Sequence, residues 1–164
     1  MNWYLIVKFL HILAVAITVG GMFARQMVRG IAKKSEDVKA VASLTQIVHR
    51  IDRVMIIPWS SAMLIFGIIL AVMLKWPIFG FLQGADKNWL LVSNILLVIM
   101  QGLIPGVFLP HNKKVATLLH TALAEGHVTS ELSTALNDKK NQMAHHAEEV
   151  IILVVAALMV LKPF

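Results

Sequence analysis

Four long apolar runs constrain the fold of this 164-residue sequence more than any other feature. A helix crosses a hydrocarbon core of about 30 Å with roughly 20 residues, at about 1.5 Å rise per residue. Each run reaches that length, and 58% of all residues are hydrophobic. The sequence therefore predicts an all-α integral membrane four-helix bundle that forms a single transmembrane domain over residues 1–164. The predicted spans are 3–24, 54–76, 89–110 and 143–164.

Lys and Arg gather in two of the three segments that connect these runs. The segments after the first and third runs are basic, whereas the segment between the second and third runs offers only Lys75 and Lys87. Basic residues stay on the cytoplasmic side of a membrane. We therefore expect a multi-pass protein with both termini on the outer side and the lipid bilayer as its first partner. The net charge of +6 then sets orientation, and we exclude nucleic acid as a partner.

Both basic segments are predicted to form helical cytoplasmic extensions. Ser35, followed by the acidic residues Glu36 and Asp37, has the pattern of a helix N-cap, and apolar residues at helical spacing follow it. The second membrane helix thus begins in the cytoplasm, and Pro58 should kink it near the membrane boundary. A second helix start at Thr129 is expected to extend the fourth helix downward.

Cysteine is absent, which removes several kinds of chemistry at once. Disulfides, thiolate catalysis, cysteine-ligated zinc and cysteine-ligated iron–sulfur clusters are all excluded. Histidine, methionine and carboxylate side chains remain as ligands for a metal or cofactor.

Polar residues inside the first apolar run are the first candidates for function. Lys8, His11, Thr18, Arg25 and Arg29 fall along one helical face. An ionisable side chain in lipid costs several kcal/mol unless it is paired, hydrated or ligated. His11 lies about 12 Å below the start of the run by helical rise. We interpret it as a metal or cofactor ligand; the alternative is a neutral imidazole hydrogen-bonded to a neighbouring helix.

Counting residues from the outer ends of the runs places two methionines at the membrane depth of His11. These are Met63 in the second run and Met100 in the third. A methionine thioether can be an axial ligand of haem iron. Packing is the alternative role, because methionine commonly fills apolar interiors.

A second polar group lies at the start of the fourth run, from His145 to Glu149. Beyond it only 150–161 is uninterrupted, and twelve residues cover about 18 Å. Either part of the group enters the membrane or the lipid around this helix is thinned. His145 and His146 each share a helical face with a glutamate. Such pairs ligate metals, orient an imidazole or relay protons. The candidate metal ligands are therefore His11, His145, His146 and Glu149.

The basic residues at the same level support two interpretations. Arg25 and Arg29 suit the carboxylates of haem propionates, or they pair with the glutamates of the fourth run, as Arg50 and Arg53 could. Further histidines reach this level and form a candidate imidazole group within reach of a metal or haem. They are His111 and His49, which join His145 and His146.

The first run also resembles a known group of proteins. Its pattern is similar to the opening of small four-helix bacterial inner-membrane proteins: Lys8 to His11 are followed by Gly20, Gly21 and Arg25. The group includes an uncharacterised family of predicted integral membrane proteins, the membrane part of copper-resistance protein D and the HemJ type of protoporphyrinogen oxidase. The resemblance implies haem b, with His11 at the position of the haem-ligating histidine, and a bacterial inner-membrane location.

Three functional hypotheses remain open. The first is a b-type haem protein for electron transfer or an oxidase-type reaction in the bilayer. It would be a haem-dependent oxidoreductase that works with a membrane redox partner or a quinone, with His11 as axial ligand. The second is a homo-oligomeric membrane protein that handles or transports protons, copper or another metal without a redox step. The third is a structural or assembly subunit of a membrane complex.

Overall fold

The computed structural model describes residues 2–163, and every regular element in that range is helical. Met1 and Phe164, the ends of the predicted domain, lie outside the described residues. The elements follow one another in this order: α1 (Trp3–Lys34), α2 (Val38–Ile51), η1 (Asp52–Ile56), α3 (Ile57–Met73), η2 (Gly80–Gln83), α4 (Trp89–Leu103), η3 (Ile104–Phe108), α5 (Leu109–Glu125), α6 (Ser130–Leu136) and α7 (Lys139–Leu161).

Four helical stretches are long and apolar enough to cross a membrane, as the sequence predicts. They are Trp3–Lys34, Val38–Met73, Trp89–Glu125 and Ser130–Leu161. Large apolar side chains on their outer faces are exposed, including Phe9 (63%) and Val98 (72%). In a membrane these faces contact lipid, because exposed apolar surface of this extent has no place in water.

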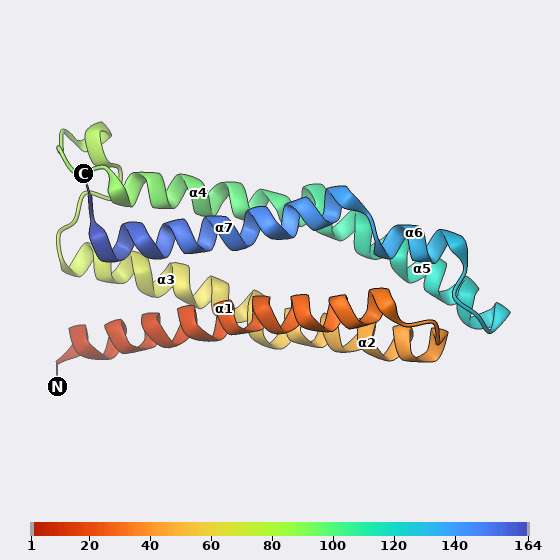
Figure 1. Cartoon of the computed structure of the whole chain (residues 1–164). Coiled ribbons are helices and arrows are strands. Elements are labelled where there is room, and N and C mark those ends of the chain that lie inside the picture. Colours follow the sequence, from red (N-terminus) through yellow and green to blue (C-terminus); the bar gives the residue numbers. More distant parts are fainter. Residues whose placement is uncertain (1, 164) are drawn as a thin grey trace.

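The helices pack as two pairs that lie side by side (Figure 1). α1 packs along α3, and α4 packs along α7; α2 lies against both α1 and α5. α1 begins and α7 ends at the same end of the molecule (Figure 1). The opposite end carries α2, α5 and α6 together with most of the basic residues, and we call it the basic end.

The helix boundaries correct one sequence prediction. Ser35 does not cap α2; it ends α1, and its backbone N–H donates to the Ala32 carbonyl at 3.3 Å. Asp37 caps α2, because its carboxylate accepts the backbone N–H of Lys39 at 2.9 Å. α1 therefore continues ten residues past the predicted end of its span, and it carries Arg25 and Arg29 on ordered helix.

Two prolines coincide with widened helical turns. Pro58 follows the π-helical turn η1, and Pro105 lies within the π-helical turn η3. A proline has no N–H to donate and its ring displaces the carbonyl four residues earlier, so one wide turn lets the helix continue. The prediction that a helix begins before Pro58 and continues into the second span is confirmed, and the kink at Pro58 stays a prediction.

The extension predicted to lengthen the fourth helix is a separate short helix. Thr129 caps α6 as expected, and its hydroxyl accepts the Leu132 N–H at 3.2 Å. α6 ends at Leu136, however, and a separate cap at Asp138 starts α7 four residues before the predicted span. The Asp138 carboxylate accepts the Asn141 N–H at 3.1 Å, which favours a new start over continuation of α6.

Aromatic residues pack together at the end of the molecule opposite the basic end. α3 stops at Met73, because Lys75 takes a left-handed conformation with φ 53°. Trp76 and Trp89 then meet edge to face with ring centroids 5.0 Å apart. The Lys162 ammonium lies 4.3 Å from the Trp76 ring centroid, so the end of α7 joins this group by a cation–π contact.

Candidate functional site

His11 on α1 is held by the backbone of α3. Its Nδ1 lies 3.0 Å from the Met63 carbonyl oxygen, which can only accept, so Nδ1 carries the proton. The ring lies against Gly67: a Cβ at that position would be 3.1 Å from the His11 Cε1 atom. With Nδ1 protonated, the lone pair of the neutral imidazole is on Nε2, the atom that a metal ion would bind.

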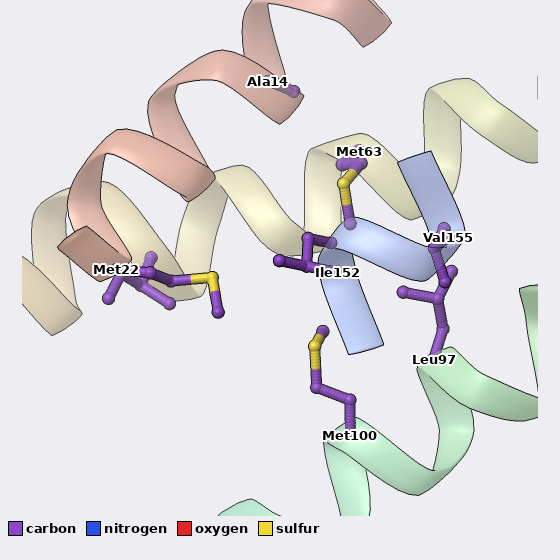
Figure 2. Close-up of a cluster of buried hydrophobic side chains, with 8 residues drawn as sticks. Ala14, Met22, Met63, Leu97, Met100, Ile152 and Val155 are labelled. Carbon is purple, nitrogen blue, oxygen red and sulfur yellow. The ribbon is translucent and has the colours of Figure 1, made fainter. Parts of the chain in front are cut away.

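Three methionine side chains belong to one buried cluster in the core between the two helix pairs. Met22, Met63 and Met100 are all buried, at 2%, 5% and 6% exposure. Figure 2 shows the Met63 and Met100 thioethers directed toward Ile152 of α7 from opposite sides. The two methionines chosen by depth therefore belong to one buried cluster, and Met63 also holds His11 through its carbonyl.

Arg25 is the centre of a buried ionic network toward the basic end. Its guanidinium donates to Asp52 of η1 at 3.1 Å and to Glu148 of α7. Arg25 is 4% exposed and Glu148 is 6% exposed, so both charges are removed from solvent and lipid alike. The pairing of a fourth-run glutamate with Arg25, one of the two sequence interpretations, is present in this structure.

His145 completes the network with both of its ring nitrogens. Arg29 donates to Nε2, and because arginine has no acceptor, the His145 proton is on Nδ1. Nδ1 donates in turn to the Glu148 carboxylate at 3.2 Å. Phe108 of η3 stacks on the imidazole with ring centroids 4.3 Å apart and planes 8° apart. His145 is thus a neutral bridge that leaves no lone pair for a metal ion.

The network joins both helix pairs through balanced charges. Arg25 pairs with Asp52 and Glu148, and Arg29 donates to His145, so the network holds two cations and two carboxylates. Buried ions of this kind are stable only when each has its partner. The immediate consequence is structural: the network fixes α1, η1 and α7 relative to one another. A proton could also pass along the His145–Glu148 pair, since imidazole and carboxylate exchange protons readily.

The other predicted ligands lie apart from these groups. His146 has a side chain that is 70% exposed, and its Nδ1 lies 3.4 Å from Glu149, away from His145. His111 is buried and lines a small cavity with the exposed His49. Within residues 2–163 no three His, Asp or Glu side chains gather in a group able to hold a metal ion.

His111 lies beyond the apolar run, at the basic end. Burial lowers the pKa of its imidazole, and the Arg29 guanidinium lowers that pKa further. His111 is therefore neutral at pH 7.

Sequence reasoning missed three residues of the site. Asp52 and Phe108 lie in the widened turns beside the two prolines, and Gly67 lies in the middle of an apolar run. An acidic residue just before a membrane run and a lone glycine within one were the only available signals. Nothing local marked Phe108, because an aromatic residue in an apolar run is ordinary.

Comparison with known families supplies the classification. Residues 5–163 match the family described as predicted integral membrane protein (DUF2269). The chain belongs to this family. Membership covers almost the whole chain and agrees with the four membrane-crossing stretches. The relation to copper-resistance protein D and to HemJ-type proteins stays a prediction. No curated protein and no solved structure matches the chain.

Proposed function

We propose that this family member binds haem b through His11 and uses it for electron transfer or an oxidase-type reaction within the bilayer. The observation that carries the proposal is the hydrogen bond from His11 Nδ1 to the Met63 carbonyl. Histidines that bind metals are usually fixed in this way, with one nitrogen donating to a carbonyl or carboxylate and the other free to coordinate. His145, with both nitrogens engaged, lacks this property.

The surroundings of His11 support an axial-ligand role. Gly67 gives the ring a place against α3 that a larger residue would fill. Thioethers of Met63 and Met100 lie in the adjacent core, and a thioether is a suitable second ligand for haem iron. When bound, haem would supply the one-electron chemistry. The chain would fix the ligand, exclude water and set the dielectric around it.

The propionate role predicted for Arg25 and Arg29 is less favoured by the geometry. Arg25 follows His11 by fourteen residues, about 21 Å along the helix, and it is already paired with Glu148. Lys8 is exposed and only one turn from His11, so it is the cation nearer to a group held there. We therefore place Arg25 and Arg29 in the ionic network and offer Lys8 as the propionate partner.

An absorption spectrum tests this proposal. The protein, expressed with ample haem and purified in mild detergent, should show a Soret band and, after dithionite, a reduced α band. His11→Ala should abolish or shift both bands, whereas His120→Ala, at an exposed position on α5, should leave them unchanged. A colourless wild-type protein would refute the proposal. Unchanged bands in His11→Ala would move the ligand to another residue.

The wider setting follows from the same proposal. Electrons would pass to or from a membrane redox partner or a quinone, and the protein would work as a homo-oligomer in a bacterial inner membrane. Its basic end would face the cytoplasm, with both termini outside, as the distribution of Lys and Arg favours.

A second candidate function is proton handling without a redox step. The buried His145–Glu148 pair favours it, because a protonatable pair inside a membrane commonly lies on a proton path. Vesicles with the reconstituted protein and an internal pH dye should then report proton entry that Glu148→Gln abolishes. Equal proton entry with wild type and Glu148→Gln would rule this function out.

Metal transport has less support, since the described residues form no group of three ligands.

A further inference from the structure

A cavity of about 200 Å³ opens at the basic end, between η3 and α5 on one side and the start of α7 on the other. We call it the α5–α7 cavity. Neither the ionic network nor His11 lines it. Its walls come from two parts of the chain that are about thirty residues apart, and they differ in chemistry. The η3–α5 wall is apolar at Gly106, Val107 and Pro110 and becomes polar at His111 and Lys114, whereas the α7 wall carries Asp138, Lys140 and Asn141.

The charged residues of the cavity favour an anionic ligand. Lys114 on α5 and Lys140 on α7 bring two cations to it from separate helices. Asp138 also lines the cavity, but its carboxylate is used as the cap of α7 and accepts the Asn141 N–H. His111, the remaining titratable group, is held neutral by burial. The lining therefore keeps one net positive charge.

Asn141 adds an unsatisfied polar group. Its side chain is only 2% exposed, and Oδ1 is buried without a hydrogen-bond partner within the described residues. Leaving such an acceptor unpaired costs about 1–3 kcal/mol. Asn141 lines the cavity, so a shift of its side chain would bring Oδ1 to a ligand hydroxyl that donates to it and removes that cost. The ligand should therefore carry a hydroxyl as well as a negative charge.

The apolar wall indicates where the rest of the ligand lies. Gly106, Val107 and Pro110 are the last residues of the third apolar run, so the wall continues the lipid-facing surface. Open space lies over Gly106, where a Cβ would meet nothing within 4 Å. The cavity thus lies where a membrane-spanning helix becomes basic, which is the level of lipid headgroups.

We propose that the α5–α7 cavity binds the headgroup of an anionic phospholipid that carries hydroxyl groups, of the phosphatidylglycerol type. Lys114 and Lys140 bind the phosphate, Asn141 accepts a headgroup hydroxyl, and an acyl chain lies along Gly106 and Val107. Basic cavities between membrane helices on the cytoplasmic side bind anionic lipids by this combination of charge and apolar contact. The proposal is independent of haem binding.

Native mass spectrometry of the full chain in a neutral detergent tests the proposal. Dioctanoyl-phosphatidylglycerol should bind saturably with one lipid per chain, and dioctanoyl-phosphatidylcholine should bind much more weakly. Lys114→Gln with Lys140→Gln should weaken phosphatidylglycerol binding about 25-fold, since each surface-level lysine contributes about fivefold. The control is Lys113→Gln with Lys139→Gln, which removes the same charge from exposed neighbours outside the cavity and should change binding by less than about twofold.

Asn141→Ala gives a second, chemically specific arm. It should weaken phosphatidylglycerol but leave phosphatidic acid, which has no headgroup hydroxyl, unaffected. Equal losses in the two lysine double variants would overturn the proposal in favour of diffuse charge attraction. Equal binding of phosphatidylcholine would overturn it in favour of apolar adhesion. Displacement of the lipid by millimolar inorganic phosphate would show a soluble-anion site instead. Thermal unfolding without lipid confirms that each variant is folded.

Discussion

Arg25 of α1 and Glu148 of α7 form a buried ion pair between residues 123 positions apart in the chain. The pair lies where the two helix pairs meet, and Asp52 and His145 extend it on either side. A charge inside a membrane protein is retained only when a partner compensates its desolvation. The arrangement therefore explains why the fourth helix can carry a glutamate and a histidine into the bundle.

Removal of one partner of this pair should destabilise the protein strongly. Arg25→Met leaves Glu148 and Asp52 without their cation, and the free energy of unfolding should fall by about 3–5 kcal/mol. Arg53→Met removes an exposed arginine of the same region and should change stability by less than about 0.5 kcal/mol. Thermal unfolding in detergent measures both. Adding Glu148→Gln to Arg25→Met should recover part of the loss, and no recovery would contradict the pairing.

Gly67→Ala should displace the His11 ring. The new Cβ would lie 3.1 Å from Cε1 of the imidazole, so the ring must give by a few tenths of an ångström, and its hydrogen bond to the Met63 carbonyl opposes that shift. Gly20→Ala is the matched control, because open space surrounds that position and both changes gain the same helix propensity. Gly67→Ala should be less stable than the control by about 1–3 kcal/mol. Equal melting temperatures would show that the ring is not confined there.

Phe108→Leu should loosen His145. It removes the stacked ring and leaves a small gap, which should cost about 1–2 kcal/mol. Phe23→Leu, at a side chain that is 53% exposed, should cost much less. In a His145→Ala background, Phe108→Leu should lose most of its effect, because contacting residues are energetically coupled. Strictly additive losses in thermal unfolding would argue against the stack.

The orientation can be tested with single cysteines, because the natural chain has none. Asp86→Cys lies in the exposed connection between α3 and α4, and Lys113→Cys lies on the exposed face of α5 at the basic end. In intact cells, a membrane-impermeant maleimide should label Asp86→Cys and should spare Lys113→Cys until the membrane is opened. The reverse labelling pattern would show that the basic end faces outward, against the distribution of Lys and Arg.

The sequence by itself determined the number of membrane-crossing stretches and the polar residues that needed an explanation. Apolar length is a local property, and a helix in lipid satisfies its own backbone, so each stretch could be recognised alone. Local patterns also predicted a helix that begins before Pro58, a helix start at Thr129 and the entry of Glu148 into the bundle. The Ser35 cap failed because several short polar residues in a row are interchangeable as caps until the end of α1 is known.

Only the tertiary structure decided which polar groups meet. Helical periodicity places His145 and His146 on different faces, but it does not say which face turns inward; packing buries the first and exposes the second. The Nδ1 proton of His11 is likewise assigned by a carbonyl 52 residues away. Such contacts depend on how whole helices rotate and pair, and buried charges favour an arrangement in which their partners lie on other segments of the chain.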